Sequence, residues 1–355
     1  MTTQRPCKVL GIMSGSSLDG LDLALCTFTE KDGHWTFAIG DARTIPYTAT
    51  WTKRLVNAAN TSALELAQLH RDLGAYIGER AKIFLSEHGS AELIASHGHT
   101  IFHQPALGFT MQIGCGAQIA ALSGLPTVVD FRTKDVALGG QGAPLVPFGE
   151  RELFPGFDAF LNLGGIANVS FHAKSSVIGY DVCTCNQALN ALANEAGKDY
   201  DADGRLAAGG SNNVAVLDKL NAMPFVHQPP PRSLGRELFD SDMLPLLLDS
   251  AIPVADRLHT CVEHIAQQIG THLNDRNAQR VLVTGGGTHN GFLMQRIRAL
   301  TTAEVVVPDT RTIDFKEALI FGFLGLKRWR SEVNTLRSVT GASQDSIGGA
   351  VYLPN

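Results

Sequence analysis

The chain has 355 residues, of which 44% are hydrophobic and 18% are charged, and its formal net charge at pH 7 is −5. At about 100–200 residues per domain this length predicts two domains, with enough apolar residues for cores that need neither disulfides nor metals. The charge excludes the basic footprint of a nucleic-acid-binding protein. The 36 glycines follow no fixed period, which excludes collagen and indicates many tight loops.

Two stretches of sequence predict a cytoplasmic protein that does not enter a membrane. The N-terminal residues lack the apolar segment of a signal peptide. The uncharged apolar run from Ala318 to Leu326 is far shorter than the ~20 residues of a membrane helix. The cysteines are spread along the chain without the density of a disulfide scaffold, so we expect reduced thiols.

The first part of the chain predicts alternating strands and helices. Apolar residues such as Leu66, Leu69 and Leu73 recur on one face, which predicts a helix over 64–85. A second, short helix is predicted over 118–122. Strands are predicted over 8–13, 21–28, 35–39, 93–96, 109–113 and 127–131, with a polar turn over 97–100.

The later part repeats the opening pattern. Strand, glycine turn and strand recur over 158–171 around Gly164 and Gly165, which indicates an internal repeat about one domain length after the first. Further strands are predicted over 280–284 and 304–308, and helices over 186–196, 214–222, 241–273, 290–300 and 315–330. This alternation predicts α/β layers with ligands bound at strand ends. The glycine-rich segment 139–144 marks the expected boundary between a domain of residues 1–135, joined by 340–355, and a domain of residues 136–339.

Two glycine-rich turns are candidate phosphate sites. The segment 11–20 offers backbone N–H groups, hydroxyls and an aspartate that could handle hydrated Mg²⁺. It is neither a Walker A loop nor a dinucleotide-binding turn, and an ordinary hairpin is the structural alternative. The glycines Gly285–Gly287 follow a buried strand and precede a helix, where the backbone can approach an anion closely. Both turns would be explained if each of them bound the same polyphosphate.

Asp181 and Arg132 are the candidate reactive and binding side chains. Asp181 ends an apolar segment before a helix, which suits a general base facing an interdomain cleft, although it could be a structural acceptor with Asn186 as a helix N-cap. The planar fork of Arg132 suits a carboxylate or phosphate. The alternative for Arg132 is an ion pair with its neighbours Asp130 or Asp135.

Two other chemistries find little support in the sequence. The spacing of Cys183 and Cys185 differs from the usual C-x₂₋₄-C of a zinc site, and Cys115 or histidines from the 97–103 segment would be needed to complete four ligands. We therefore predict no metal-ligating cluster of protein side chains. A serine hydrolase is disfavoured because the chain has no Gly-x-Ser-x-Gly elbow.

Taken together and in order, the motifs resemble one family, the anhydro-N-acetylmuramic acid kinases, within the actin, Hsp70 and sugar kinase fold group. The resemblance covers essentially the whole chain and is most specific in its first and third segments. The segments that carry it are GIMSGSSLDGLD (11–22), SHGHTIFH (96–103), DFRTKDVALGGQGAPLVP (130–147), NLGGIANV (162–169), YDADG (200–204), SLGRE (233–237), TGGG (284–287) with Asn290, EAL (317–319) and TGA (340–342).

The resemblance implies a fold, a reaction and ligands. The fold would be a two-domain actin-like ATPase fold, related to ribonuclease H, with an interdomain cleft. Family members use ATP, Mg²⁺ and water to open the 1,6-anhydro ring of 1,6-anhydro-N-acetylmuramic acid and phosphorylate O6. The product is N-acetylmuramic acid 6-phosphate, in peptidoglycan recycling. The implied partners are this small sugar and a second copy of the chain in a homodimer, with neither nucleic acid nor membrane.

The resemblance also implies roles for individual residues. Asp181 matches the catalytic base that deprotonates the attacking water. ATP-binding positions match Gly15, Ser16, Ser17, Leu18, Asp19, Gly20, Leu21, Asp22, Gly285, Gly286 and Gly287, and substrate-contacting positions match Ser96, Thr100, Arg132 and Glu317. The chain departs from the family after Asp181, where Val182-Cys-Thr-Cys-Asn186 replaces the common Thr or Cys followed by Gly-Pro-Gly-Asn.

Three other functions remain open at this point. The chain could be a kinase of the same fold acting on another anhydro- or amino-sugar, which a substrate panel would separate. It could be a non-catalytic protein gated by ATP, in which Asp181 would be dispensable. A zinc-dependent hydrolase is the third, and metal analysis would test it.

Overall fold

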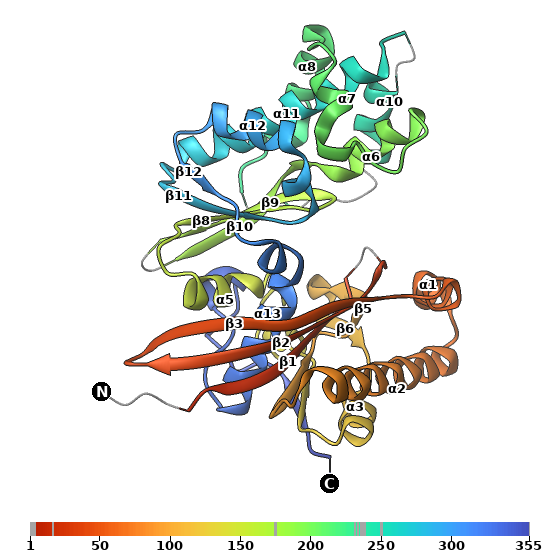
Figure 1. Cartoon of the computed structure of the whole chain (residues 1–355), viewed down its shortest axis with the longest axis vertical. Coiled ribbons are helices and arrows are strands. Elements are labelled where there is room, and N and C mark those ends of the chain that lie inside the picture. Colours follow the sequence, from red (N-terminus) through yellow and green to blue (C-terminus); the bar gives the residue numbers. More distant parts are fainter. Residues whose placement is uncertain are drawn as a thin grey trace. The chain divides into compact units, whose positions relative to one another are not determined.

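The computed structural model describes residues 5–15, 18–173, 176–230, 232, 234, 239–248 and 251–354 (Figure 1). The chain divides into two compact units, the first made of Met1–Pro155 with Phe315–Asn355 and the second of Gly156–Asp314. These bounds differ from the predicted division at 135/136 and 339/340. The difference arises because residues 136–155, and the helix that continues from Phe315, both pack within the first unit.

The first unit is built on a mixed sheet with the strand order β13-β7-β4-β1-β2-β3. Strands β1, β2 and β3 form an antiparallel meander, β4 and β7 run parallel to β1, and β13 pairs antiparallel with β7. A separate antiparallel pair, β5–β6, lies outside this sheet. The bounds are β1 (Cys7–Met13), β2 (Gly20–Lys31), β3 (His34–Pro46), β4 (Leu93–Ser96), β5 (His99–Gln104), β6 (Phe109–Ile113), β7 (Thr127–Val129) and β13 (Ala350–Tyr352).

Helices cover both faces of this sheet. The alternation of side chains along β1 sends Leu10 and Ile12 into a core with α2 and α3. On the opposite face Gly11 meets α13, and Phe323 of α13 packs against Phe28 of β2 at a ring distance of 5.4 Å. The bounds are α1 (Ala49–Val56), α2 (Ala63–His88), α3 (Gly116–Ser123), α4 (Thr133–Ala137), α5 (Val146–Leu153), α13 (Thr310–Trp329, in this unit from Phe315) and α14 (Arg337–Thr340).

The second unit has a smaller sheet with the order β10-β9-β8-β11-β12. Again three antiparallel strands are followed by two parallel ones. The strands are β8 (Ala159–Leu163), β9 (Ile166–His172), β10 (Val177–Thr184), β11 (Arg280–Thr284) and β12 (Glu304–Val306). The helices are α6 (Asn186–Glu195), α7 (Arg205–Ala208), α8 (Val214–Asn221), α10 (Leu244–Leu247), α11 (Val254–Asp275) and α12 (Gly291–Leu300).

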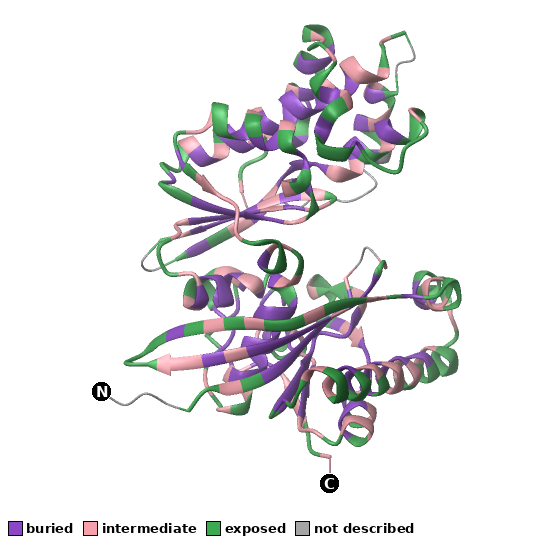
Figure 2. Cartoon of the chain, viewed as in Figure 1, coloured by how far each residue is buried: buried purple, intermediate pink, exposed green. Residues whose placement is uncertain are grey.

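The two sheets confirm the predicted α/β class and internal repeat. In each unit the first three strands form the meander and the next two along the sheet are parallel, so β3-β2-β1-β4-β7 corresponds to β10-β9-β8-β11-β12. This duplicated order is the ribonuclease H-like arrangement expected of an actin-like fold. Figure 2 shows buried residues concentrated in the central strands of each sheet. None of the described helices combines the length and the apolar composition that crossing a bilayer requires.

Several predicted elements need correction. The helix predicted over 241–273 is interrupted: a short π-helix (Phe239–Met243) and the short α10 precede α11, which starts after Pro253. Proline lacks the N–H that an interior helical position must donate, so the helix begins there instead of continuing. The polar turn predicted over 97–100 is shorter, because His99 already belongs to β5. Helices α1 and α5 were not predicted.

The approach of α13 to β1 yields a stability prediction. A Cβ added at Gly11 would lie 1.9 Å from the Ala318 carbonyl oxygen. We expect Gly11→Ala to destabilise the first unit by about 1–3 kcal/mol, because backbone cannot yield as a side chain can. Differential scanning calorimetry should show a lower Tm. Gly209→Ala is the matched control, since its added Cβ meets nothing within 3.6 Å and its φ is helical. An unchanged Tm for Gly11→Ala would contradict this account of the contact.

Candidate active site

Arg132 is held by groups of the first unit. It follows β7 and precedes α4, and its Nε donates to His97 Nε2 at 3.0 Å while Nη1 donates to the Gly142 carbonyl at 2.7 Å. Among the described residues Nη2 has no acceptor. Burial lowers the pKa of Arg132 to about 10, opposed by the negative charge of Glu317, so the guanidinium stays protonated at neutral pH. The ion pairs with Asp130 or Asp135 that the sequence left open do not form in the described part of the chain.

His97 holds Arg132 as a neutral acceptor. The His97 ring is buried, and burial lowers its pKa well below the ordinary value, with the charge of Arg132 adding to the effect. Its Nδ1 lies 2.9 Å from the Gly98 carbonyl, to which it donates, so Nε2 is free of a proton and accepts from Arg132. This fixes one tautomer and one orientation of the pair.

The glycine-rich segment beside Arg132 is organised by Asp135. This carboxylate is fully buried and accepts from the Gly142 N–H and the Thr340 hydroxyl, both at 2.7 Å. Its Oδ2 would lie 2.2 Å from a Cβ added at Gly140. A buried carboxylate needs such donors to offset its desolvation. Asp135 thereby ties the segment carrying Gly142, and with it Arg132, to the C-terminal part of the chain.

The other predicted substrate residues lie in the same unit. Ser96 is fully buried at the end of β4, where its hydroxyl accepts from the Gly98 N–H at 3.3 Å. Thr100, on β5, accepts from Gln112 Nε2 at 3.3 Å. Glu317 is exposed on α13 near enough to Arg132 for their charges to interact. The unit therefore brings Arg132 and Glu317 together, next to the turn that Ser96 holds.

The first glycine-rich turn joins β1 to β2. Ser14, just after β1, is buried and accepts from the Tyr47 hydroxyl at 2.8 Å, while its own hydroxyl lies 3.1 Å from His99 Nδ1. Gly15 and Leu18 flank Ser16 and Ser17, which lie outside the described residues, and Leu18 has a positive φ of 59°. Asp19 is exposed at the end of the turn.

The last three predicted nucleotide residues of this segment belong to β2. Gly20 packs on β3, where an added Cβ would meet the Ile45 carbonyl oxygen at 2.5 Å. Leu21 is a fully buried core residue, so only its backbone could serve a ligand. Asp22 accepts from the Thr44 hydroxyl at 2.5 Å. The described residues on either side of Ser16 and Ser17 therefore form the two strands of a hairpin, as the structural alternative expected.

The second glycine turn lies in the second unit, between β11 and α12. Gly285 has a φ of 90°, and a Cβ there would lie 2.6 Å from Asn162 Oδ1; at Gly287 it would lie 2.7 Å from the Leu163 side chain. These two glycines are therefore required by packing on the end of β8. Gly286 differs, because it is exposed and its added Cβ meets nothing closer than 3.8 Å. Of the three, Gly286 is the one with room for a ligand beside its backbone.

Asp181 lies inside β10 and not at its end, which corrects the predicted placement. The ladder with β9 shifts register between Asp181 and Cys183, so Val182 is an extra residue in a β-bulge. The Asp181 side chain is half-buried, and its Oδ2 accepts from the Leu234 N–H at 2.8 Å. A bulge locally bends its strand and can re-aim the side chains beside it. Asn186 is the first residue of α6, and its Nδ2 donates to the Leu163 carbonyl.

The thiols behind Asp181 are buried. Burial raises the pKa of Cys183 and Cys261, and raises that of Cys185 to about 12. All six cysteines of the chain are free thiols, as predicted. Among the residues that the structure describes, no group of three or more His, Cys, Asp or Glu is placed to hold a metal ion.

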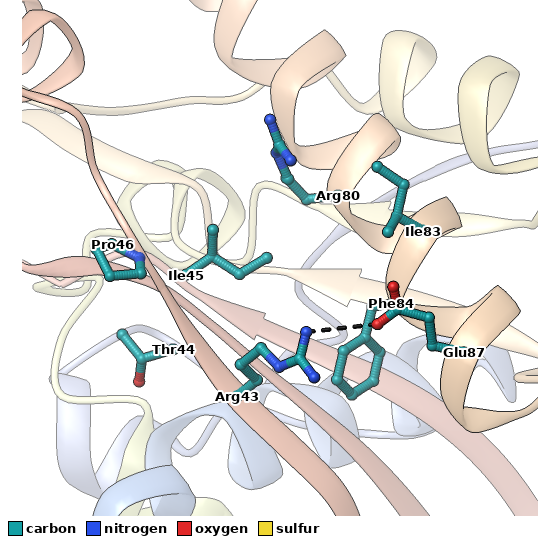
Figure 3. Close-up of a pocket in the computed structure, with 8 residues that line it drawn as sticks. All are labelled: Arg43, Thr44, Ile45, Pro46, Arg80, Ile83, Phe84 and Glu87. Atoms are coloured by element: carbon teal, nitrogen blue, oxygen red, sulfur yellow. Dashed lines mark hydrogen bonds and ion pairs between the residues drawn. The ribbon is translucent and has the colours of Figure 1, made fainter.

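A surface pocket of about 190 Å³ lies elsewhere, between β3 and α2 (Figure 3). It is smaller than the roughly 300–1,000 Å³ typical of ligand sites and contains none of the predicted site residues. Arg43 and Glu87 form an ion pair of 3.4 Å across it. Its lining residues are Arg43, Thr44, Ile45, Pro46, Arg80, Ile83, Phe84 and Glu87. We assign it no role in the chemistry.

Sequence reasoning missed the residues that hold the site in place. His97 and Asp135 belong to motifs quoted above, but their partners lie far away in the sequence. His97 bonds Arg132, 35 positions away, and Asp135 bonds Thr340, 205 positions away. Arg232 and Leu234, which contact Asp181, come from a loop more than 50 positions later. A single sequence carries no signal for such pairs.

Comparison with known proteins identifies the family of the chain. A family model described as anhydro-N-acetylmuramic acid kinase matches residues 7–354. The chain is 36% identical to an anhydro-N-acetylmuramic acid kinase of Vibrio cholerae, covering 98% of each chain. The chain belongs to the anhydro-N-acetylmuramic acid kinase family. It is 35% identical to the protein of that name from Actinobacillus pleuropneumoniae, over 97% of this chain and 98% of the relative.

A solved structure is similar at a more distant level. It is the activator of the 2-hydroxyisocaproyl-CoA dehydratase from Clostridium difficile with bound ADPNP, with 12% identity and a TM-score of 0.45. The match covers 91% of this chain and 96% of that one.

The buried thiols give a prediction for this member of the anhydro-N-acetylmuramic acid kinase family. In the native protein at pH 8, we expect a thiol reagent such as DTNB to leave Cys26, Cys183, Cys185 and Cys261 unmodified, because they are buried and protonated. Cys7 and Cys115 are half-buried and can react. Peptide mass spectrometry after labelling identifies the modified positions, and unfolding in guanidinium is the control that should expose all of them. Rapid native labelling of Cys183 or Cys185 would show that this loop opens to solvent.

Proposed function

We propose that the chain is itself an ATP-dependent 1,6-anhydro-N-acetylmuramic acid kinase, supplying N-acetylmuramic acid 6-phosphate for the reuse of peptidoglycan sugars. The observation that carries this proposal is the family match over residues 7–354, nearly the whole chain. The described geometry supports it, since Asp181, Arg132 and the turn of Gly285–Gly287 are each held in place by specific contacts.

Asp181 is the general base of the proposed reaction. It takes a proton from a water molecule, whose oxygen attacks C1 of the sugar. The bond between C1 and the bridging O6 then breaks, and O6 attacks the γ-phosphorus of ATP, so that ADP leaves. The Leu234 N–H on Oδ2 orients the carboxylate for this step. Water, sugar and ATP together account for every atom of N-acetylmuramic acid 6-phosphate and ADP, and the proton that Asp181 took is released to solvent.

The glycine turns are the proposed phosphate sites. The backbone around exposed Gly286 and the turn from Gly15 to Asp19 offer N–H groups to polyphosphate. Mg²⁺ is commonly held by one or two carboxylates together with substrate phosphates, and not by a cage of protein ligands. The exposed carboxylate of Asp19 fits that requirement, and bound Mg²⁺ would neutralise charge on the transferred phosphoryl group.

Arg132 is the proposed anchor for the sugar. Its Nε and Nη1 are committed to His97 and Gly142, which leaves Nη2 directed by a rigid frame toward the lactyl carboxylate or another sugar oxygen. We propose Thr100 and Glu317 as further sugar contacts. Ser96 is fully buried, so its proposed share is to hold the turn that carries His97.

The decisive experiment follows oxygen from water into product. Wild-type protein is incubated with 1,6-anhydro-N-acetylmuramic acid and Mg-ATP in ¹⁸O-labelled water, and the product is analysed by mass spectrometry. We expect a 6-phosphorylated sugar with the heavy oxygen at C1 and none in the phosphate. Unlabelled product kept in the same water measures spontaneous exchange at C1. Asp181→Asn should lower turnover by at least about 10²-fold, the scale of general-base catalysis.

Other outcomes would redirect or end the proposal. Product from a different anhydro-sugar but not from this one would retain the kinase and change its substrate. Full activity of Asp181→Asn would remove the assigned base. No sugar phosphate from any substrate, with ATP still bound, would favour the non-catalytic alternative.

Gly286 gives a separate test of nucleotide binding. Gly286→Ala adds a methyl group that makes only an ordinary van der Waals contact, 3.8 Å from Asn186 Nδ2, so the protein should fold with an unchanged Tm. If the backbone there approaches phosphate, the methyl group obstructs it, and we expect the KM for ATP to rise by about tenfold or more while the KM for the sugar changes little. Gly209→Ala, whose added Cβ also makes only ordinary contacts at 3.6 Å, is the matched control and should change neither KM. An unaltered KM for ATP in Gly286→Ala would contradict the assignment.

A further inference from the structure

We infer that Arg232 is a positioning residue that locks the strand carrying Asp181 into its reactive conformation. The inference deepens the proposed function and rests on it. Arg232 lies 51 positions after Asp181 and is 8% exposed. Its hydrogen bonds in the described structure reach the backbone of Asp181 and not the carboxylate, so it acts through the position of that residue.

The guanidinium of Arg232 donates hydrogen bonds to backbone carbonyls of two segments. Its Nε donates to the Asp181 carbonyl at 2.9 Å and Nη2 to the Val182 carbonyl at 3.1 Å. Its Nη1, which carries two N–H groups, lies 2.9–3.2 Å from three carbonyls at the 3₁₀-helix Pro224–His227, those of Phe225, Val226 and Gln228, so one hydrogen is shared between two of them. The five N–H groups of the planar guanidinium serve these carbonyls, and a lysine has only three donors.

The position of Asp181 within β10 explains why this strand needs the hydrogen bonds of Arg232. β10 is the edge strand of its sheet, and the bulge at Val182 interrupts its ladder with β9. Carbonyls there lack a neighbouring strand, and buried carbonyls must find other donors. Arg232 supplies them with its side chain, and its own carbonyl accepts the Asp181 N–H at 3.2 Å. The Leu234 N–H, two residues further along the same segment, reaches Asp181 Oδ2. Arg232 and Leu234 together therefore contact both the backbone and the carboxylate of Asp181.

His272 of α11 accepts a further hydrogen bond from Arg232. Its Nε2 lies 2.7 Å from Arg232 Nη2 and must accept, so the proton is on Nδ1, which lies 3.2 Å from the Tyr180 hydroxyl. Burial lowers the pKa of His272 to about 4, and the charge of Arg232 adds to this effect. His272 is therefore neutral at working pH and presents a fixed acceptor to the guanidinium.

The charges around Arg232 set the expected pH behaviour. Tyr180, Cys183 and Asp181 of β10 interact with Arg232, and Asp275 and Arg276 at the end of α11 interact with Tyr180 and His272. The interaction between Arg232 and Asp181 is attractive and favours the carboxylate form of Asp181. Loss of the cation and of the oriented Leu234 N–H should both make Asp181 easier to protonate.

The first test replaces Arg232 and a matched arginine. Arg232→Met should lower kcat by about 10²-fold with little change in either KM, because a base displaced by about 1 Å has this effect. It should also move the acid limb of the kcat profile to higher pH. Arg232→Lys keeps the charge and should keep the acid limb near that of the wild type, with a smaller loss of kcat.

Arg257→Met is the control. Arg257 is equally buried in the second unit and bonds the Leu247 and Ile252 carbonyls and Glu195. It should lose stability like Arg232→Met, yet keep the wild-type kcat and pH profile.

The second test uses chemical rescue. Arg232 and His272 line a groove of about 510 Å³ with Asn221, Gln267, Gln268 and Asp275 among its walls. A small cation can enter from this side, so guanidinium at tens of millimolar should restore part of the kcat of Arg232→Ala and not that of Asp181→Asn. Urea at the same concentration is the uncharged control and should restore none.

The outcomes separate the two proposals. An inactive wild-type protein would defeat the proposed function itself. An active wild type with Arg232→Met matching Arg257→Met in kcat and pH profile would leave the function standing and overturn the role of Arg232. Should Arg232→Met fail to fold, the Lys variant and the rescue of Arg232→Ala still decide.

Discussion

Buried backbone carbonyls must find donors, and in this chain arginine side chains provide many of them at the places that matter. Arg132 bonds the Gly142 carbonyl, Arg232 bonds five carbonyls from two segments, and Arg257 bonds the carbonyls of Leu247 and Ile252. Each arginine lies where a loop or bulge breaks the regular ladder. An unpaired carbonyl there would be costly. The irregular segments that carry the candidate chemistry are thus as constrained as the strands.

The neutral histidines complete the same scheme. His97 and His272 each accept from an arginine through Nε2, and each is kept neutral chiefly by burial. A protonated imidazole could not accept, and it would place a second positive charge against the guanidinium. Each unit therefore contains a neutral histidine that orients an arginine. In the first unit this interaction holds Arg132, and in the second it holds the strand that carries Asp181.

Patterns local in sequence predicted much of the fold, and pairs distant in sequence explain what was missed. The helical spacing of Leu66, Leu69 and Leu73 predicted α2, and the repeated strand–turn–strand pattern predicted the duplicated sheet. Both patterns depend on residues that are close together in the sequence. The break before α11 was missed although Pro253 marks it. At the site, Asp181 and Arg132 were chosen from motifs and resemblance. Arg232 and Asp135 could not be, since their partners are set by the folded chain.

The first unit is discontinuous, and this has a consequence for synthesis. Residues 156–314 form the second unit from one continuous stretch, so its core can close as soon as that stretch has emerged. The sheet of the first unit is made earlier but lacks α13, which packs over Gly11 and Ala95, and β13, which pairs with β7. One face and one edge of that sheet therefore stay uncovered while the ribosome makes the whole second unit. The part translated first is completed last, and a nascent chain of this protein presents bare apolar sheet to chaperones for most of its synthesis.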